Sequence, residues 1–148
     1  MNNKAQQAEV RSETEESLLW QIIDAAKELE SRLETELAKV GLSLAKGSVL
    51  RTLGEANEPL SLSELADQNC CVRSNITQLV DRLETDGLVR RVNDPDDRRI
   101  TRAALTIAGR KAYEDAIKIV LIQEQAVEGL LTPEEAAVLS QALKKLSA

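Results

Sequence analysis

One continuous stretch, residues 65–106, constrains the fold of this chain more than any other part of its sequence. A short helical segment is followed by a tight turn, by a second amphipathic helix that ends at Gly87, and by two short β-rich runs separated by Asp and Arg residues. A glycine just past the last helical residue is typical of a helix C-terminus. The pattern predicts a helix-turn-helix followed by a two-stranded β-ribbon.

The second helix of this stretch, predicted to start near Val72, has two chemically different faces. Its apolar residues recur at helical spacing and form an inner face, consisting of Ile76, Leu79, Val80 and Leu83. The opposite face and its edge carry hydrogen-bonding and basic side chains, at Arg73, Ser74, Asn75, Thr77, Gln78, Asp81 and Arg82. Such a face offers the donors and acceptors that read base edges in the major groove of DNA. On a helix alone this signal is weak, but the basic hairpin that follows makes it strong.

The turn between the two predicted strands combines acidic and basic residues. Residues 93–97 read Asn-Asp-Pro-Asp-Asp, which is typical of a tight turn, and Arg98 and Arg99 follow directly. Asp96 or Asp97 can pair with one of these arginines and fix its direction. Turn chemistry alone also accounts for the acidic residues, and both explanations can hold together.

The rest of the chain is predicted to be helical and to pair two copies of the central unit. Helix starts are marked by capping residues at Ser12 with Glu15, Ser43, Ser61 with Glu64, Thr106, and Thr132 before Pro133. We therefore expect a mainly α fold with a small β-wing, in one compact domain of 148 residues. Its parts are an N-terminal dimerisation helix (12–42), a winged helix-turn-helix DNA-binding region (43–106) and C-terminal dimerisation helices (107–148).

The net charge of −6 does not by itself suit a DNA-binding protein, but the charges are unevenly distributed. The predicted first helix is strongly acidic, whereas residues 65–106 carry seven arginines, Arg73, Arg82, Arg90, Arg91, Arg98, Arg99 and Arg102. Arginine makes bidentate contacts to phosphate groups and to guanine. A solvated charged face explains the cluster less well than a nucleic-acid contact does, because the arginines gather on one helix and one hairpin.

Composition disfavours several other classes of function. The chain has no histidine, and no cluster of acidic and cysteine residues has the spacing of metal ligands, so we expect no enzyme, metal site or cofactor. Trp20 and Tyr113 are the only large aromatic residues, which disfavours base stacking with single-stranded nucleic acid. No apolar run is long enough to cross a membrane and no signal peptide opens the chain, so we expect a cytoplasmic protein without a membrane partner.

The sequence closely resembles the MarR/SlyA family of bacterial winged-helix transcription regulators. The resemblance is carried by Leu-Val-Asp-Arg-Leu-Glu-x-x-Gly-Leu-Val at 79–89, by Asp-Pro-Asp-Asp-Arg-Arg at 94–99, and by Leu105-Thr106 with Gly109. The order of helices on both sides also fits, so it covers nearly the whole chain. It implies a homodimer whose recognition helices enter successive major grooves of a pseudo-palindromic operator, about 34–36 Å apart. Each wing would insert an arginine into the flanking minor groove.

The resemblance also implies particular DNA contacts and a mode of regulation. Carried over by position, the contacts fall on Arg73, Ser74, Asn75, Thr77, Gln78, Arg82, Arg98 and Arg99. Asp97 is the expected orienting partner of Arg99. Repression relieved by a ligand is the usual logic of the family, so we expect a repressor, although activation also occurs among its members.

Three candidate signals could control such a regulator. A small aromatic or phenolic anion can bind between the dimer helices and the DNA-reading unit, with Trp20 as a candidate wall. The simpler interpretation of Trp20 is a core or interface residue. Redox chemistry at Cys70 and Cys71 is the second candidate, with Cys70 oxidised and linked to another thiol, since a disulfide between the two neighbours would be strained. An unknown ligand or no ligand is the third.

Three residues before the recognition helix depart from the usual family pattern. The family commonly has Gly, Leu and Ser where this chain has Cys70, Cys71 and Val72. Cys71 is expected to replace a core leucine, because buried free cysteine behaves as a small hydrophobic residue. Cys70 is expected to be more exposed near the positive end of the helix, which lowers the pKa of a thiol and favours reactivity.

A winged-helix module that binds only other proteins is a further alternative. The polar face between Arg73 and Arg82, together with Arg99, argues against it, because protein-docking surfaces expose apolar anchors.

Overall fold

The computed structural model describes residues 17–69 and 73–147 of the 148-residue chain. The predicted cap at Ser12 and Glu15, and the predictions for Cys70, Cys71 and Val72, lie outside these residues. The described elements follow in the order α2 (Leu18–Ala38), α3 (Leu44–Ala56), β1 (Leu60–Ser61), α4 (Leu62–Gln68), α5 (Arg73–Thr85), β2 (Val89–Asn93), β3 (Thr101–Leu105), α6 (Ile107–Glu128) and α7 (Pro133–Leu146).

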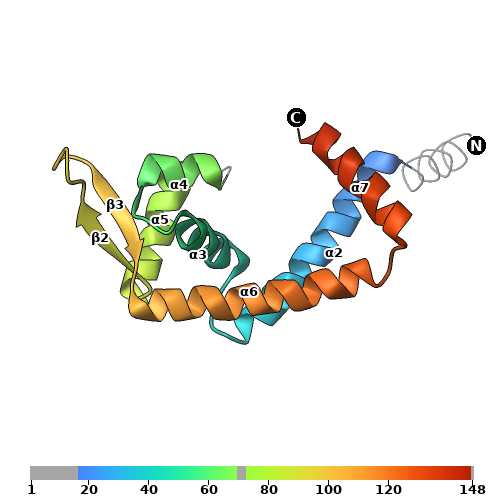
Figure 1. The fold of residues 1–148 in the computed structure, drawn as a ribbon, viewed down its shortest axis with the longest axis horizontal. Helices are drawn as coiled ribbons and strands as arrows, with labels where there is room; N and C mark the ends of the chain where they lie inside the picture. Colours follow the sequence, from blue (N-terminus) through green and yellow to red (C-terminus); the bar gives the residue numbers. More distant parts are fainter. Residues whose placement is uncertain (1–16, 70–72, 148) are drawn as a thin grey trace, which may run out of the picture.

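A winged-helix unit, residues 44–105, contains most of the hydrophobic core. Helices α3, α4 and α5 pack against one another and against the small sheet (Figure 1). Its completely buried side chains come from each of these parts, and include Val49, Leu50, Leu65, Ile76, Val80 and Leu83. The mainly α fold with a small β-wing is thus confirmed.

The wing belongs to a three-stranded antiparallel sheet with the order β1-β3-β2, and not to the two-stranded ribbon expected from the sequence. The extra strand β1 pairs Leu60 with Ala103 and Ser61 with Arg102. Two residues are too few to give an alternating pattern, so the sequence carries no periodic signal for this strand. The added strand anchors the base of the wing to the segment that leads into α4.

Helix starts agree with the capping residues of the sequence. The Ser43 hydroxyl accepts the backbone N–H of Lys46, and the Thr106 hydroxyl accepts that of Gly109. Complete capping boxes open α4, with Ser61 and Glu64, and α7, with Thr132 and Glu135. These caps depend only on neighbours in the sequence, which explains why they are predictable.

The start of α6 is fixed directly against the end of α5. Gly87 has a φ of +73°, which ends the helix in the left-handed conformation. The Thr106 hydroxyl donates to the Gly87 carbonyl oxygen at 2.6 Å. A Cβ atom on Gly109 would lie 1.8 Å from the Leu88 carbonyl oxygen, so only glycine allows this approach. The long helix α6 therefore begins at a tight junction with the recognition helix.

The remaining helices form an arm that leaves the winged-helix unit (Figure 1). We use "helical arm" for residues 18–32 of α2, residues 118–128 of α6, and α7. No residue of α7 is buried, and the arm exposes large apolar side chains, namely Leu18, Leu19, Trp20, Leu29, Leu121, Ile122, Val138, Leu139, Leu143 and Leu146. In residues 17–69 and 73–147, no helix has the length and apolar character needed to cross a membrane.

Candidate DNA-binding interface

The recognition helix α5 is oriented by its apolar face. Ile76, Val80 and Leu83 have no exposed surface and pack in the core of the winged-helix unit. Their spacing places them on one side of the helix, so the opposite side faces outward. The direction of the outward side therefore follows from the packing of these three residues.

The outward side of α5 is polar. Arg73 is the first described residue of the helix. Thr77 is half-buried, and the exposed residues on this side are Ser74, Asn75, Gln78 and Arg82. Together these four supply hydroxyl, amide and guanidinium groups, which are the groups that hydrogen-bond base edges in the major groove.

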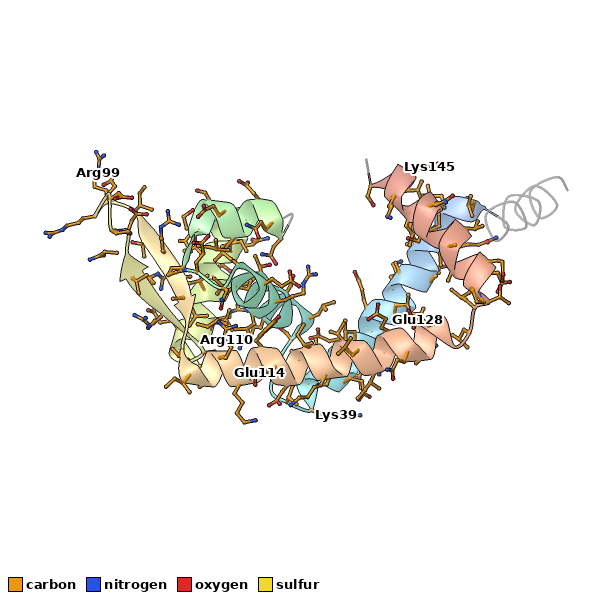
Figure 2. All side chains as sticks on the ribbon, in the orientation of Figure 1. Lys39, Arg99, Arg110, Glu114, Glu128 and Lys145 are labelled. Carbon is orange, nitrogen blue, oxygen red and sulfur yellow. The ribbon has the colours of Figure 1, made fainter. Side chains whose placement is uncertain are left out.

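At the tip of the wing, Arg99 projects away from the rest of the molecule (Figure 2). Its side chain is 89% exposed, yet it is held by one partner. The Asp97 carboxylate accepts hydrogen bonds from Nε and Nη2 of Arg99, at 3.0 and 2.8 Å, and from its backbone N–H at 3.0 Å. These hydrogen bonds hold the pKa of the Asp97 carboxyl below its usual range. The geometry agrees with Asp97 as the orienting partner of Arg99, and Arg98 is exposed beside it.

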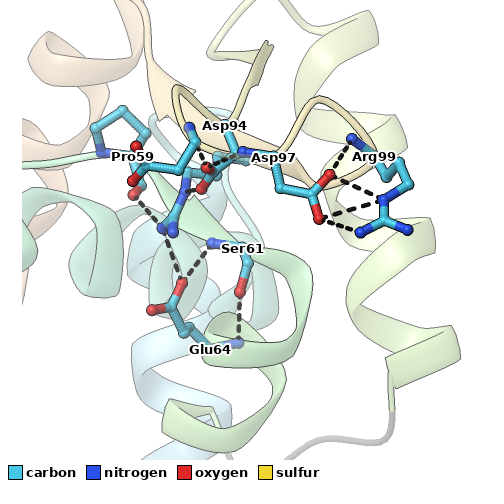
Figure 3. A network of polar contacts seen from close by, with 8 residues as sticks. Pro59, Ser61, Glu64, Asp94, Asp97 and Arg99 are labelled. Carbon is cyan, nitrogen blue, oxygen red and sulfur yellow. Dashed lines mark hydrogen bonds and ion pairs between the residues drawn. The ribbon is translucent and has the colours of Figure 1, made fainter.

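A second set of contacts ties the base of the wing to α4 (Figure 3). The guanidinium of Arg102 donates to the carboxylates of Asp94 and Glu64 and to the Pro59 carbonyl oxygen. The hydrogen bond from Arg102 is the main reason that the pKa of Asp94 lies below its usual range. The pKa of Glu64 is lowered chiefly by the backbone N–H of Ser61, with a smaller effect of Arg102. This network fixes where the wing turn begins.

Arg91 connects the wing to the recognition helix. Its guanidinium donates to Asp81 at 2.5 Å and to Glu84, both on α5. These hydrogen bonds raise the pKa of Arg91, and the one to Asp81 has the largest effect. Arg91 and Arg102 thus bind carboxylates of the protein itself. The seven central arginines therefore do not form one cluster of free cations, since these two have protein partners. The contacts implied by the family resemblance do not include them.

An apolar cavity of about 280 Å³ lies between α2, α3 and α6, beneath the winged-helix unit. Leu33, Leu37, Ile117 and Val120 form much of its wall, and its polar side chains are Ser48, Arg51 and Tyr113. Sequence reasoning did not single out Arg51 or the cavity, because the walls come from three separate helices. The one sequence feature that could have indicated this cavity is Tyr113, the only tyrosine of the chain.

Trp20 is not among the residues that line this cavity. It is 46% exposed near the start of α2, beside the exposed Leu18 and Leu19. Its role as a pocket wall stays a prediction, and its surroundings agree better with an interface residue.

A polar helix presented beside an arginine-tipped wing defines a winged helix-turn-helix DNA-binding protein. Residues 42–101 match the MarR family. The transcriptional regulator FarR of Neisseria gonorrhoeae is 30% identical over 126 residues, which cover 85% of this chain and 86% of FarR. The chain therefore belongs to the MarR family and is a DNA-binding transcriptional regulator.

Solved structures agree with this assignment. The transcriptional repressor CouR, bound to a 23-mer DNA duplex, has a TM-score of 0.83 and 29% identity, and the match covers 90% of this chain and 94% of CouR. NadR in complex with 4-hydroxyphenylacetate has a TM-score of 0.71 and 29% identity, with coverage of 88% and 92%. The likeness extends well beyond the winged-helix unit, since both matches cover most of each chain.

Proposed function

We propose that this chain is a homodimeric repressor that binds a pseudo-palindromic operator and is released by a small aromatic or phenolic anion. The observation that carries the proposal is the polar outward side of α5 beside Arg99, which is exposed and oriented by Asp97. In each copy, α5 enters a major groove and the wing places Arg99 in the flanking minor groove. The base and backbone contacts come from Arg73, Ser74, Asn75, Thr77, Gln78, Arg82, Arg98 and Arg99.

The helical arm supports dimerisation. Val138 is 68% exposed and Leu146 64% exposed on α7, although both are large apolar residues. A groove of about 760 Å³ runs between α2, α6 and α7, and is lined by residues such as Leu29, Val127 and Leu139. Exposed apolar surface on this scale marks an interaction site. A second copy of the chain is the occupant, so residues 12–42 and 107–148 serve as the dimerisation regions.

Binding to the DNA upstream of its own gene tests the proposal. The expected result is a saturable complex whose affinity falls steeply as salt rises, because each neutralised phosphate contributes about −0.9 to the slope of log K against log salt. Arg99→Ala is expected to weaken this complex about tenfold or more, within the range for loss of a specific arginine contact. Unchanged affinity of a dimeric Arg99→Ala protein would contradict the wing contact.

The cavity between α2, α3 and α6 supports the effector part of the proposal. Its apolar walls suit an aromatic ring, while the Arg51 guanidinium and the Tyr113 hydroxyl suit a carboxylate or phenolate. NadR, with 29% identity, has been solved with 4-hydroxyphenylacetate, which has this chemistry. A ligand that binds the DNA-free conformation more tightly lowers operator affinity by the ratio of its two affinities.

Salicylate is a suitable probe for this site. It is expected to release wild-type protein from the operator, and Arg51→Gln is expected to raise the salicylate concentration needed for release. Ala45→Gln, on the same helix and outside the cavity, is the matched control. Release of wild type and Arg51→Gln at the same concentration would remove Arg51 from the site.

Redox sensing by Cys70 is the second candidate function, and it rests on the sequence alone. If that thiol is the sensor, peroxide releases wild-type protein from DNA and the Cys70→Ser protein stays bound. A Cys70→Ser protein that still leaves DNA under peroxide would rule out this thiol as the sensor.

A further inference from the structure

The side chain of Arg102 joins three segments of the winged-helix unit. Its Nε donates to the carboxylate of Asp94 at the start of the wing turn. Its Nη1 donates to the Glu64 carboxylate of α4 at 3.1 Å and to the Pro59 carbonyl oxygen at 3.2 Å. One guanidinium therefore links the wing to the first helix of the helix-turn-helix (Figure 3).

Asp94 passes this link on to the wing turn. Its side chain is only 6% exposed. One carboxylate oxygen accepts the backbone N–H groups of Asp96 and Asp97, at 2.8 and 3.0 Å, and the other accepts Arg102. Asp97 in turn orients Arg99. Continuous contacts thus run from α4 to the guanidinium at the wing tip.

We propose that Arg102 is a positioning residue for DNA recognition, which fixes the wing relative to α4 and so aims Arg99. The proposal rests on the proposed function, because it takes Arg99 to be a DNA contact. A hairpin tip that projects into solvent has few tertiary contacts of its own. Holding it in one orientation before binding reduces the entropy lost when the complex forms. Arg102 acts through Asp94, and its own side chain is directed at protein acceptors.

The glutamate that receives Arg102 is also part of a helix cap. The Glu64 carboxylate accepts the backbone N–H of Ser61 at 2.7 Å, and its own N–H donates to the Ser61 hydroxyl at 3.2 Å. The cap fixes the position of this carboxylate, which explains why it provides a rigid attachment point for Arg102. The position of the wing is therefore fixed relative to the start of α4.

A DNA-free measurement tests the positioning directly. In wild-type protein, ¹⁵N relaxation is expected to give order parameters of about 0.85 for the amides of residues 96–99, and Arg102→Gln is expected to lower them below about 0.6. Arg90→Gln removes the same charge from an exposed position on β2, where the described residues give it no ion pair, and is expected to leave them unchanged. Low values in wild type, or unchanged values in Arg102→Gln, would overturn the proposal.

A double-mutant cycle on the operator tests the consequence for recognition. Arg102→Gln is expected to weaken binding about fivefold on its own and less than about twofold in an Arg99→Ala background, because coupled residues are not additive. Arg90→Gln is expected to weaken binding by the same factor in both backgrounds. Full additivity of Arg99 and Arg102 would overturn the aiming role.

Arg102→Lys separates geometry from charge. Lysine keeps the positive charge but cannot reach three acceptors with a planar fork, so Arg102→Lys is expected to behave like Arg102→Gln in both measurements. Wild-type binding and order parameters in Arg102→Lys would overturn the geometric argument.

If Arg99→Ala alone has no effect on affinity, the wing contact of the proposed function fails and the aiming role fails with it. Lowered order parameters in Arg102→Gln would then show that only the link between wing and α4 stands. Thermal unfolding of each variant checks that it is folded at the temperature of measurement.

Discussion

The winged-helix unit and the helical arm differ in how completely they bury their large apolar side chains. Among the described residues of the winged-helix unit, the one large apolar side chain that is exposed is Ile100, at the wing tip. The arm buries almost none of its large apolar side chains, and α7 buries no residue at all. The unit therefore buries its apolar side chains within the single chain, with help from Leu37 of α2 and Ala116 of α6, whereas the arm leaves its own exposed.

The polar residues show the same contrast. In the unit, Arg91, Arg102 and Lys46 pair with carboxylates from other segments, beside one exposed pair within a helix, Arg51 with Glu55. In the arm, the ion pairs of α2 join residues three or four positions apart on one exposed helix, such as Arg32 with Glu28. Exposed pairs of this kind contribute little to stability. Ion pairs between distant segments thus belong mainly to the winged-helix unit, and exposed apolar side chains belong mainly to the arm.

Ile76→Ala disrupts the core of the winged-helix unit and has the largest expected effect. Loss of a completely buried isoleucine from α5 is expected to lower the free energy of unfolding by about 2–5 kcal/mol. Urea denaturation at fixed protein concentration measures it. Gln78→Ala, on the outward side of the same helix, is the control and is expected to change stability by no more than about 0.5 kcal/mol. Equal losses for the two variants would contradict the assignment of inner and outer faces.

Leu143→Glu breaks the arm without touching the unit. Leu143 is 46% exposed on α7, so the single chain tolerates a charge there, while a dimer interface does not. The expected result is dissociation to monomers in sedimentation, with operator affinity lowered about 100-fold because the two half-sites are no longer engaged together. Gln141→Glu adds the same charge to the same helix at an exposed polar position. A dimeric Leu143→Glu protein would show that this part of α7 lies outside the interface.

Asp94→Asn tests whether the ion pair between Asp94 and Arg102 stabilises the winged-helix unit, through the pH dependence of stability. The folded pKa of Asp94 lies below 3.8, chiefly because of Arg102. A carboxylate with a lowered pKa stabilises the folded state fully above its unfolded pKa, and this contribution is lost as pH falls through the folded value. Asp94→Asn is thus expected to be less stable than wild type at neutral pH, with a difference that shrinks toward about pH 2. A difference that does not depend on pH would contradict the ion pair.

The fluorescence of Trp20 gives the smallest expected effect. It is the only tryptophan of the chain, and it is 46% exposed in the single copy. If a second copy covers this end of α2, the emission maximum shifts to longer wavelength on dilution and in Leu143→Glu. Emission that stays constant while sedimentation reports dissociation would place Trp20 away from the interface.

Local features of this chain were predictable, and contacts between distant segments were not. Ser61 with Glu64 and Thr132 with Glu135 form the expected caps, since each depends on residues three positions apart. The pairing of Arg102 with Glu64 spans 38 positions, and no sequence period encodes it. The strand β1 was not predicted from the sequence because it is only two residues long.

The candidate site divides in the same way. The outward side of α5 follows from helical spacing, so its residues could be named from the sequence alone. The link from Asp97 to Arg99 spans two positions and was also accessible. The cavity with Arg51 and Tyr113 was not, because three helices must first be brought together to form it.

The contacts at Gly87, Thr106 and Gly109 join the start of the long helix α6 to the end of the recognition helix. With 22 residues, α6 is about 33 Å long. A tilt of α6 by about 6° therefore displaces its far end by about 3.5 Å. A change in the tilt of α6 is therefore expected to move the end of α5, since the hydrogen bond from Thr106 to Gly87 and the close approach of Gly109 to Leu88 join the two helices there.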